Sequence, residues 1–429
     1  MFGFANFLLL ALFAAAVFDL IFALARGGGL RGALHGLWNT PHLLFGQQLA
    51  EWRLQLGRIL FAAGLAAYEI SVEFCNSMAR QNWAWVQGVM SPVLEWLAFL
   101  CFGAKILFGT RYTWRELLAG GALYFIARWV YFNSQNIWWI GIVVAVLAAK
   151  DVPLRRPLQV YFASGCAAMA VVLALHFAGI VAPDLTSERM GALRGTYGYG
   201  HPNTFGGLVF GLVLAYALLR AQKVRWVDCL LVFAVGVFLL VGPASRSAAL
   251  CTLALAVGLV FCRLRAGHSV PRWWPGTCAG MVGLTAAVSY LLPLLVIKVG
   301  PWNNDIGPAW LAKLDSLLTC RISLTWMAYR LLDVKIAGQV FNWPTVDNSF
   351  AFALFQFGPV VAALLGILFA AALWGHAKQG RRVEVCCLFA MLAYAYMEVQ
   401  PFHLTTNPTA LLLCGAVFAQ TSARWQKIE

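Results

Sequence analysis

The chain has 429 residues, of which 61% are hydrophobic and only 11% are charged, and its formal net charge is +14. Soluble domains carry about 25% charged residues, so this composition excludes them and indicates an integral membrane protein. The basic residues form short clusters between apolar segments, as control of membrane topology requires, so the positive charge does not indicate a nucleic-acid partner. The eleven cysteines are scattered without metal-ligand spacing, and we interpret them as small core hydrophobes.

Apolar segments follow one another along the whole chain, and several approach the roughly 20 residues that a helix needs to cross a bilayer. They cover residues 4–25, 58–75, 91–109, 115–131, 135–149, 157–180, 204–221, 226–242, 247–262, 275–297, 349–374, 383–399 and 408–421. The short alternating segments of a membrane β-barrel are absent from the sequence. The expected fold is therefore all-α, a polytopic transmembrane bundle of about 12 to 14 spanning helices in one membrane domain over residues 1–429.

The basic clusters predict the orientation of the bundle. They fall in alternating loops, which the positive-inside rule places in the cytoplasm together with the C-terminus. The intervening loops are then outer loops, at residues 181–203, 242–246, 298–348 and 400–407. Counting this alternation back along the thirteen segments places the N-terminus outside.

The first outer loop ends in the polar stretch RGTYGYGHPNTFGG, residues 194–207. Pro202 biases His201 toward an extended conformation, and Asn203 is a good N-cap, so a helix is expected to begin near Thr204. Its free backbone N–H groups and the positive end of its dipole would face outward and attract anions. A well-capped turn with an incidental histidine is the other interpretation.

Three arginines lie on the outward side near helix ends, where the positive-inside rule disfavours them: Arg194, Arg246 and Arg321. Arg246 stands in the short turn VGPASRSAALC, which must place it at the membrane boundary. There it either snorkels to lipid phosphate or faces the bundle.

The loop 298–348 is the one long outer loop, and it contains KLDSLLTCRISLTWMAYRLLD. From Arg321 to Asp333 this stretch predicts an amphipathic helix, lying on the outer surface or folded over a cavity. Asp347 and Asn348 then precede an apolar segment as polar capping residues. A long structured loop of this kind usually forms a lid or a substrate surface.

The four stretches RGTYGYGHPNTFG, GPASRSA, DSLLTCRISL and VDNSFAFALFQFGPV occur in this order. In order and spacing they resemble the Wzy-type polymerases of bacterial capsular and exopolysaccharide assembly, within the O-antigen polymerase and ligase superfamily. The resemblance covers residues 90–420. It implies a metal-independent glycosyltransferase without cofactors, in the bacterial cytoplasmic membrane, with its active site facing outward.

The substrates implied by the resemblance are polyprenyl-pyrophosphate-linked oligosaccharide repeat units, as both donor and acceptor. The growing glycan leaves its lipid carrier at the anomeric carbon and is joined to a hydroxyl of the next lipid-linked unit. The implied partners are the lipid bilayer and the chain-length regulator and flippase of the same pathway.

The resemblance implies that Arg194, Arg246 and Arg321 hold the pyrophosphate. The chemistry agrees, because a pyrophosphate leaving group requires positive charge and directed donors, and planar guanidinium forks suit phosphate. For the attacking hydroxyl, His201 is the candidate base, with His403, Glu398 and Asp347 as rivals. Contacts to substrate are expected from Tyr197, Asn203, Asp347, Asn348, Glu398 and His403.

Two alternatives remain. O-antigen ligases use a histidine in their large outer loop, and residues 298–348 contain none, which favours a polymerase. A lipid-linked oligosaccharide flippase would show internal repeats and polar residues near the membrane midplane. Polarity here is concentrated at one rim, with Asp19 and Lys105 as exceptions that could pair inside the bundle or sit near a helix end.

Overall fold

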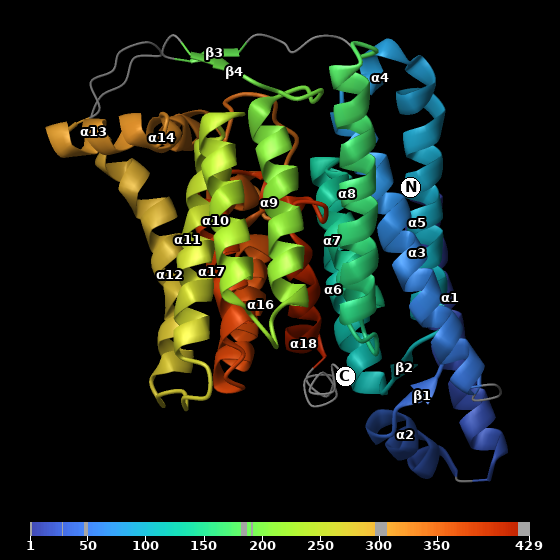
Figure 1. Cartoon of the computed structure of the whole chain (residues 1–429). Coiled ribbons are helices and arrows are strands. Elements are labelled where there is room, and N and C mark those ends of the chain that lie inside the picture. The colour runs from blue at the N-terminus through green and yellow to red at the C-terminus, as the bar shows by residue number, and fades with distance from the viewer. Residues whose placement is uncertain are drawn as a thin grey trace. The chain divides into compact units, whose positions relative to one another are not determined.

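The computed structural model describes residues 2–27, 29–46, 50–181, 187–189, 192–296 and 307–418, which are mostly helical (Figure 1). Eight helices in this part of the chain are long and apolar enough to cross a membrane. Shorter apolar helices cover Ile137–Ala148, Trp226–Val241 and Pro408–Val417. These helices confirm the all-α polytopic bundle of a multi-pass membrane protein. The number of 12 to 14 spanning helices remains a prediction.

The chain divides into two compact units. The first comprises Met1–Arg128, Ile140–Pro183 and Ala410–Glu429, and the second comprises Trp129–Trp139 and Asp184–Thr409. The single membrane domain expected from the sequence remains a prediction.

The first unit is built around three long helices, of which α3 packs against both α5 and α8. Its elements are α1 (Phe2–Ala25), α2 (Gly29–Asn39), β1 (His42–Leu43), α3 (Ala50–Asn76), α4 (Ala79–Asn82), the π-helical turn η1 (Val86–Met90), α5 (Ser91–Phe108), β2 (Arg111–Tyr112), α6 (Trp114–Ser134), α7 (Ile137–Ala148), α8 (Arg155–Phe177) and α18 (Cys414–Val417). The end of α6 and the start of α7 belong to the second unit. β1 and β2 form a short antiparallel pair.

Both ionisable residues that stood out in the apolar sequence of the first unit have local partners. Asp19 lies 3.2 Å from His42 and accepts a hydrogen bond from the backbone N–H of Phe45. The Lys105 ammonium donates to the carbonyls of Gly109 and Lys150, at 2.9 and 2.8 Å. Each buried charge is therefore compensated by residues near a helix end.

The second unit contains the stretches singled out in the sequence. Its elements are β3 (Ser187–Arg189), β4 (Ala192–Arg194), α9 (Pro202–Leu219), α10 (Trp226–Val241), α11 (Arg246–Leu264), α12 (Trp274–Leu291), η2 (Leu292–Leu295), α13 (Ala309–Leu317), α14 (Arg321–Leu331), α15 (Ser349–Phe352), η3 (Ala353–Phe357), α16 (Pro359–Lys378), α17 (Arg382–Met397) and η4 (Gln400–Phe402). The turn η5 (Pro408–Leu413) begins in the second unit, and its residues from Ala410 onward belong to the first. β3 and β4 pair antiparallel. α13 and α14 lie across one end of the long helices (Figure 1). The helix predicted from Arg321 is confirmed and ends at Leu331.

The apolar segment predicted over residues 349–374 does not form one continuous helix, because the chain breaks at Gly358. Gly358 has a φ of 87°, and a Cβ atom there would lie 2.1 Å from the carbonyl oxygen of Ile336. Only glycine fits this position without strain. α16 then begins at Pro359, whose fixed φ suits the first helical position. Hydrophobicity alone did not reveal this break, since apolar residues continue on both sides.

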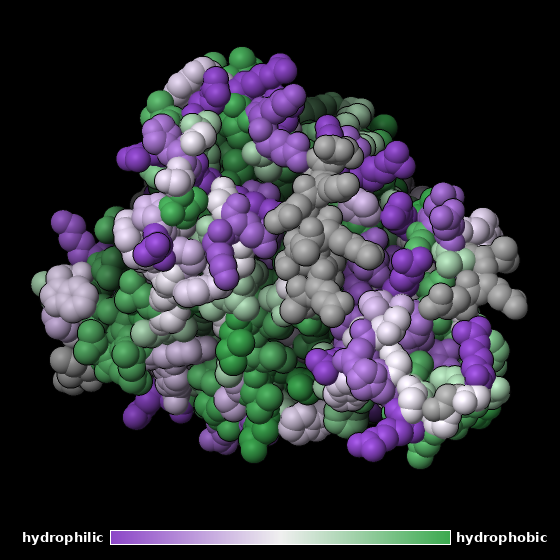
Figure 2. Space-filling view, turned by 90° about the horizontal axis from the view of Figure 1, so that it is seen from below, coloured by the Kyte–Doolittle hydropathy of each residue, from purple (hydrophilic) through white to green (hydrophobic). Residues whose placement is uncertain are grey.

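Short connections bring the basic loops of the second unit to one end. The turns α9–α10, α11–α12 and α16–α17 lie at the end opposite α13 and α14 (Figure 1). Figure 2 views the molecule from that end, where hydrophilic side chains stand among hydrophobic ones. The opposite end of the unit holds the starts of α9 and α11 and therefore the polar stretches of the sequence.

Candidate functional site

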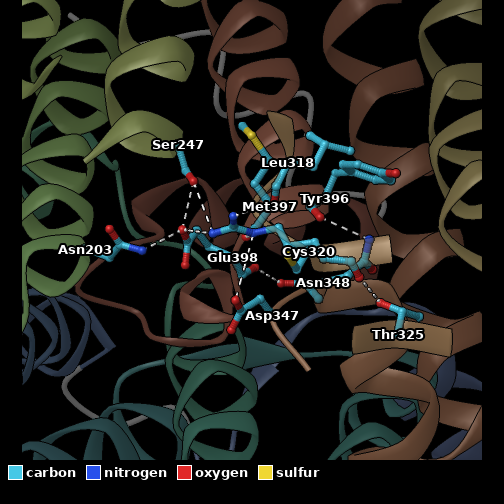
Figure 3. A network of polar contacts seen from close by, with 12 residues as sticks. Asn203, Ser247, Leu318, Cys320, Thr325, Asp347, Asn348, Tyr396, Met397 and Glu398 are labelled. Carbon is cyan, nitrogen blue, oxygen red and sulfur yellow. Dashed lines mark hydrogen bonds and ion pairs between the residues drawn. The ribbon is translucent and has the colours of Figure 1, made fainter. Parts of the chain in front are cut away.

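A buried network of polar side chains joins several segments of the second unit, with Glu398 at its centre (Figure 3). Glu398 directly follows α17 and is only 5% exposed. Its Oε1 atom accepts hydrogen bonds from Arg321 Nη2 at 2.6 Å, Ser247 Oγ at 2.8 Å and Asn203 Nδ2 at 3.1 Å. Residues from α9, α11, α14 and the end of α17 therefore meet at one carboxylate oxygen.

Arg321, the first residue of α14, is 8% exposed and is held by the protein on every nitrogen of its guanidinium group. Besides the bond to Glu398, Nη1 donates to the carbonyl of Leu318 at 2.9 Å, and Nε donates to the carbonyl of Met397. The carboxylate of Asp347 lies 4.0 Å from Nε. Arg321 thus fastens the start of α14 to the end of α17 and supplies a buried positive charge.

Arg194, the last residue of β4, is 6% exposed and joins the same network through Asn203. Its Nη2 donates to Asn203 Oδ1 at 2.8 Å and to the carbonyl of Ala244 at 3.2 Å. The Asn203 amide therefore bridges the arginine and Glu398, with its oxygen toward the donor and its nitrogen toward the acceptor. This bridge links two of the three predicted arginines to one carboxylate.

The prediction that Asn203 caps α9 is wrong, because His201 is the N-cap. The helix begins at Pro202 instead of Thr204, and His201 Nδ1 accepts the backbone N–H of Asn203 at 3.1 Å. Proline suits the first helical position, which moves the cap one residue earlier and frees the Asn203 side chain for the network. Because Nδ1 accepts in this contact, a neutral imidazole carries its proton on Nε2. The exposed His201 ring is therefore engaged as a cap.

Close packing brings α9 beside the turn that precedes α11. A Cβ atom at Gly206 would lie 2.3 Å from the Oγ atom of Ser245, so the helix can approach this turn only because position 206 is glycine. This close approach sets the start of α11 against the start of α9. It also places Ser247, two residues beyond that turn, within reach of Glu398.

Arg246 and Tyr197 have surroundings different from those of the buried arginines. Arg246 opens α11 with an exposed side chain, whereas the next residue, Ser247, is buried in the network. Tyr197 has a φ of 51°, and its ring lies 5.1 Å from that of Phe205 and 5.8 Å from that of Phe238. Tyr197 therefore contributes to an aromatic cluster beside the polar stretch.

The capping role predicted for Asn348 is confirmed. Its Oδ1 accepts the backbone N–H groups of Phe350 and Ala351 at 2.9 and 3.1 Å, so it caps α15. Its Nδ2 donates to the carbonyl of Tyr396 at 3.0 Å. The neighbouring Ser349 Oγ donates to the carbonyl of Glu398 at 2.5 Å. Asn348 and Ser349 thus position the backbone that carries the Glu398 carboxylate.

Two candidate bases outside the helices have pKa values shifted in opposite directions. Burial raises the pKa of Glu398 above its usual value, and the Arg321 guanidinium opposes this shift. Burial lowers the pKa of His403 to about 4, and its ring lies 3.9 Å from that of Trp138. His403 is therefore neutral and weakly basic near pH 7, while the raised pKa makes the ionised Glu398 carboxylate more basic than an ordinary glutamate.

Two members of the network, Ser247 and Glu398, were not predicted from the sequence to have central roles. Ser247 lies inside GPASRSA beside Arg246, and only the arginine was singled out there. Glu398 was predicted as a substrate contact and as one rival base, but not as the centre of a network. A useful signal was the position of Glu398 at the end of an apolar segment, where a carboxylate requires a buried partner.

The chemistry available at this network is that of two buried guanidinium groups, the buried carboxylate of Glu398, the more exposed carboxylate of Asp347 and neutral donors. Metal-free chemistry stays a prediction; across the described ranges, no three His, Cys, Asp or Glu side chains are grouped so that they could hold a metal ion. Comparison of the chain with protein-family models, with curated proteins and with solved structures finds no match in any of the three.

Proposed function

We propose that this chain is a membrane glycosyltransferase that polymerises polyprenyl-pyrophosphate-linked oligosaccharide repeat units into capsular or exopolysaccharide chains. The reaction takes place on the outer side of the bacterial cytoplasmic membrane. The observation that supports it most is the convergence of four separate sequence stretches. They supply Arg194 and Asn203, Ser247, Arg321, and Ser349 to one buried network around Glu398.

The arginines suit a reaction in which pyrophosphate leaves. Charge-assisted hydrogen bonds from guanidinium to phosphate are strong, and they are stronger still where water is excluded. Arg194 is buried and donates to the carbonyl of Ala244. Ala244 belongs to the turn that leads to Arg246, at the start of α11. The backbone N–H groups of that first helical turn also favour an anion. We assign pyrophosphate binding to Arg194 and Arg246.

Arg321 has a different role in this proposal. Its guanidinium is already bound to Glu398 and to two backbone carbonyls, so it is the least available of the three for a phosphate. We assign it to holding Glu398 in place. The ligase alternative lacks its loop histidine, since residues 298–348 contain none.

One observation favours the flippase alternative. Glu69 and Glu73 lie one turn apart on the candidate span α3 and are 1% and 0% exposed. Buried carboxylates inside a membrane span are typical of ion or proton pathways in transporters. A transport function of the first unit is therefore the second candidate.

The lipid-linked glycan pool of cells that lack the protein separates these functions. A polymerase predicts that single repeat units accumulate on the outer leaflet, because they are flipped but not joined. Accumulation on the inner leaflet would indicate a flippase, and free polymer that is not attached to its final acceptor would indicate a ligase. Cells complemented with Arg194→Ala at wild-type protein level should show the same pool as the deletion, because alanine cannot replace the guanidinium charge.

A further inference from the structure

We infer that Glu398 is the general base for the acceptor hydroxyl, acting through its Oε2 atom. This inference rests on the proposed glycosyl transfer and names the group that receives the proton in it. The other three candidate bases, His201, His403 and Asp347, have surroundings that suit proton transfer less well.

The hydrogen bonds of Glu398 leave one carboxylate oxygen for substrate. Arg321, Ser247 and Asn203 all donate to Oε1. Within the described part of the chain, no side-chain or backbone donor is hydrogen-bonded to Oε2. A carboxylate that is fixed through one oxygen presents the other in a defined direction, as a general base requires.

The competing bases are occupied or differently placed. The Nδ1 atom of His201 caps α9, and the low pKa of His403, about 4, makes its imidazole a weak base. Asp347 is 31% exposed, whereas the Glu398 side chain is 6% exposed. Burial raises the pKa of Glu398 and so increases the basicity of its carboxylate, while Arg321 keeps the ionised form accessible.

The step is balanced without any further reactant. The acceptor hydroxyl oxygen forms a bond to the anomeric carbon of the donor glycan. The bond from that carbon to the pyrophosphate oxygen breaks, and its electron pair leaves with polyprenyl pyrophosphate. The hydroxyl proton passes to Oε2 of Glu398. Arg321, Ser247 and Asn203 act as positioning residues, because they hold Oε1 and do not receive the proton.

A base must be ionised to act, so elongation should slow as the pH falls through the raised pKa of Glu398. The charged and titratable groups that face this carboxylate are Arg321, Asp347, Tyr394 and Cys251. Of these, only Asp347 ordinarily titrates in the acid range. Its negative charge raises the pKa of Glu398, so Asp347→Asn should move the acid limb of the rate profile to lower pH.

The test uses the purified full-length protein in nanodiscs with synthetic lipid-linked repeat units, and it measures donor binding and elongation separately. Glu398→Gln keeps an oxygen that can accept from Arg321. It should bind donor like the wild type but elongate about 100- to 10,000-fold more slowly, as expected for loss of a general base. Glu398→Asp should recover part of the rate, and Asp347→Asn should still elongate with the shifted acid limb.

The outcomes separate the base from the function. Two results would overturn the assignment of Glu398. One is near-wild-type elongation by Glu398→Gln. The other is an Asp347→Asn variant whose elongation rate collapses and whose rate profile no longer falls at acid pH. If Glu398→Gln does not fold, the direction of the shift in Asp347→Asn decides alone. Failure of the wild type to elongate or to release polyprenyl pyrophosphate would instead reject the proposed function.

Discussion

Removal of the Arg321 guanidinium should destabilise the second unit strongly, because it leaves a carboxylate buried without its charged partner. Glu398 is 5% exposed, and Arg321 Nη2 lies 2.6 Å from its Oε1. Removing one partner of a buried ion pair lowers the free energy of unfolding by about 3 to 5 kcal/mol. The remaining donors, Ser247 and Asn203, keep the expected loss for Arg321→Met near the lower end, at about 3 kcal/mol.

A double-mutant cycle isolates the pair. Glu398→Gln removes the negative charge, so Arg321→Met should be much less harmful in that background, with a coupling energy of about 2 kcal/mol. Thermal unfolding in nanodiscs measures the losses, and a domain of this size shifts by about 2 to 4 °C per kcal/mol. Arg330→Met is the matched control, since Arg330 lies on the same helix with an exposed side chain. Losses that add within about 0.5 kcal/mol, or an Arg321→Met protein as stable as the control, would refute the ion pair as a buried, coupled unit.

Three further predictions concern the reaction. Elongation should persist in excess chelator, because guanidinium groups supply the positive charge; loss of activity that magnesium restores would contradict this. Arg246→Lys keeps the charge but loses the bidentate geometry of the guanidinium, so elongation should slow about 10- to 150-fold at equal protein level. Full activity of this variant would instead indicate that Arg246 contacts lipid phosphate. His201→Asn preserves an N-cap acceptor, so its chain-length ladder from pH 5.5 to 8.5 should match the wild type; an absent ladder would make His201 catalytic.

The helices were predictable from the sequence because apolar length is a strong signal in a membrane protein. The limits of α9, α11 and α17 agree with the predicted segments to within two residues. The break at Gly358 was not predictable in this way, since the residues around it are as apolar as a continuous helix. At this break Gly358 packs against the Ile336 carbonyl, which belongs to the long loop earlier in the chain, and such a contact has no local sequence signal.

The candidate site was predictable in its stretches but not in its centre. Local rules identified the polar stretch 194–207 and the cap at Asn348. They assigned the cap of α9 to Asn203, because asparagine is the better capping residue, but Pro202 fixed the helix start one position earlier. The central position of Glu398 depends on α9, α11 and α14 meeting beyond the end of α17, and such tertiary proximity has no local pattern.

Reconstitution of the purified protein with two defined lipid-linked repeat units tests the central claim most directly. We predict a ladder of lipid-linked oligomers and the release of one polyprenyl pyrophosphate for each new glycosidic bond. The ladder should be absent with Arg194→Ala, whose buried guanidinium is assigned to the leaving group. Repeat units that cross the bilayer without being joined, or transfer only to an acceptor that is not a lipid-linked repeat unit, would contradict the account.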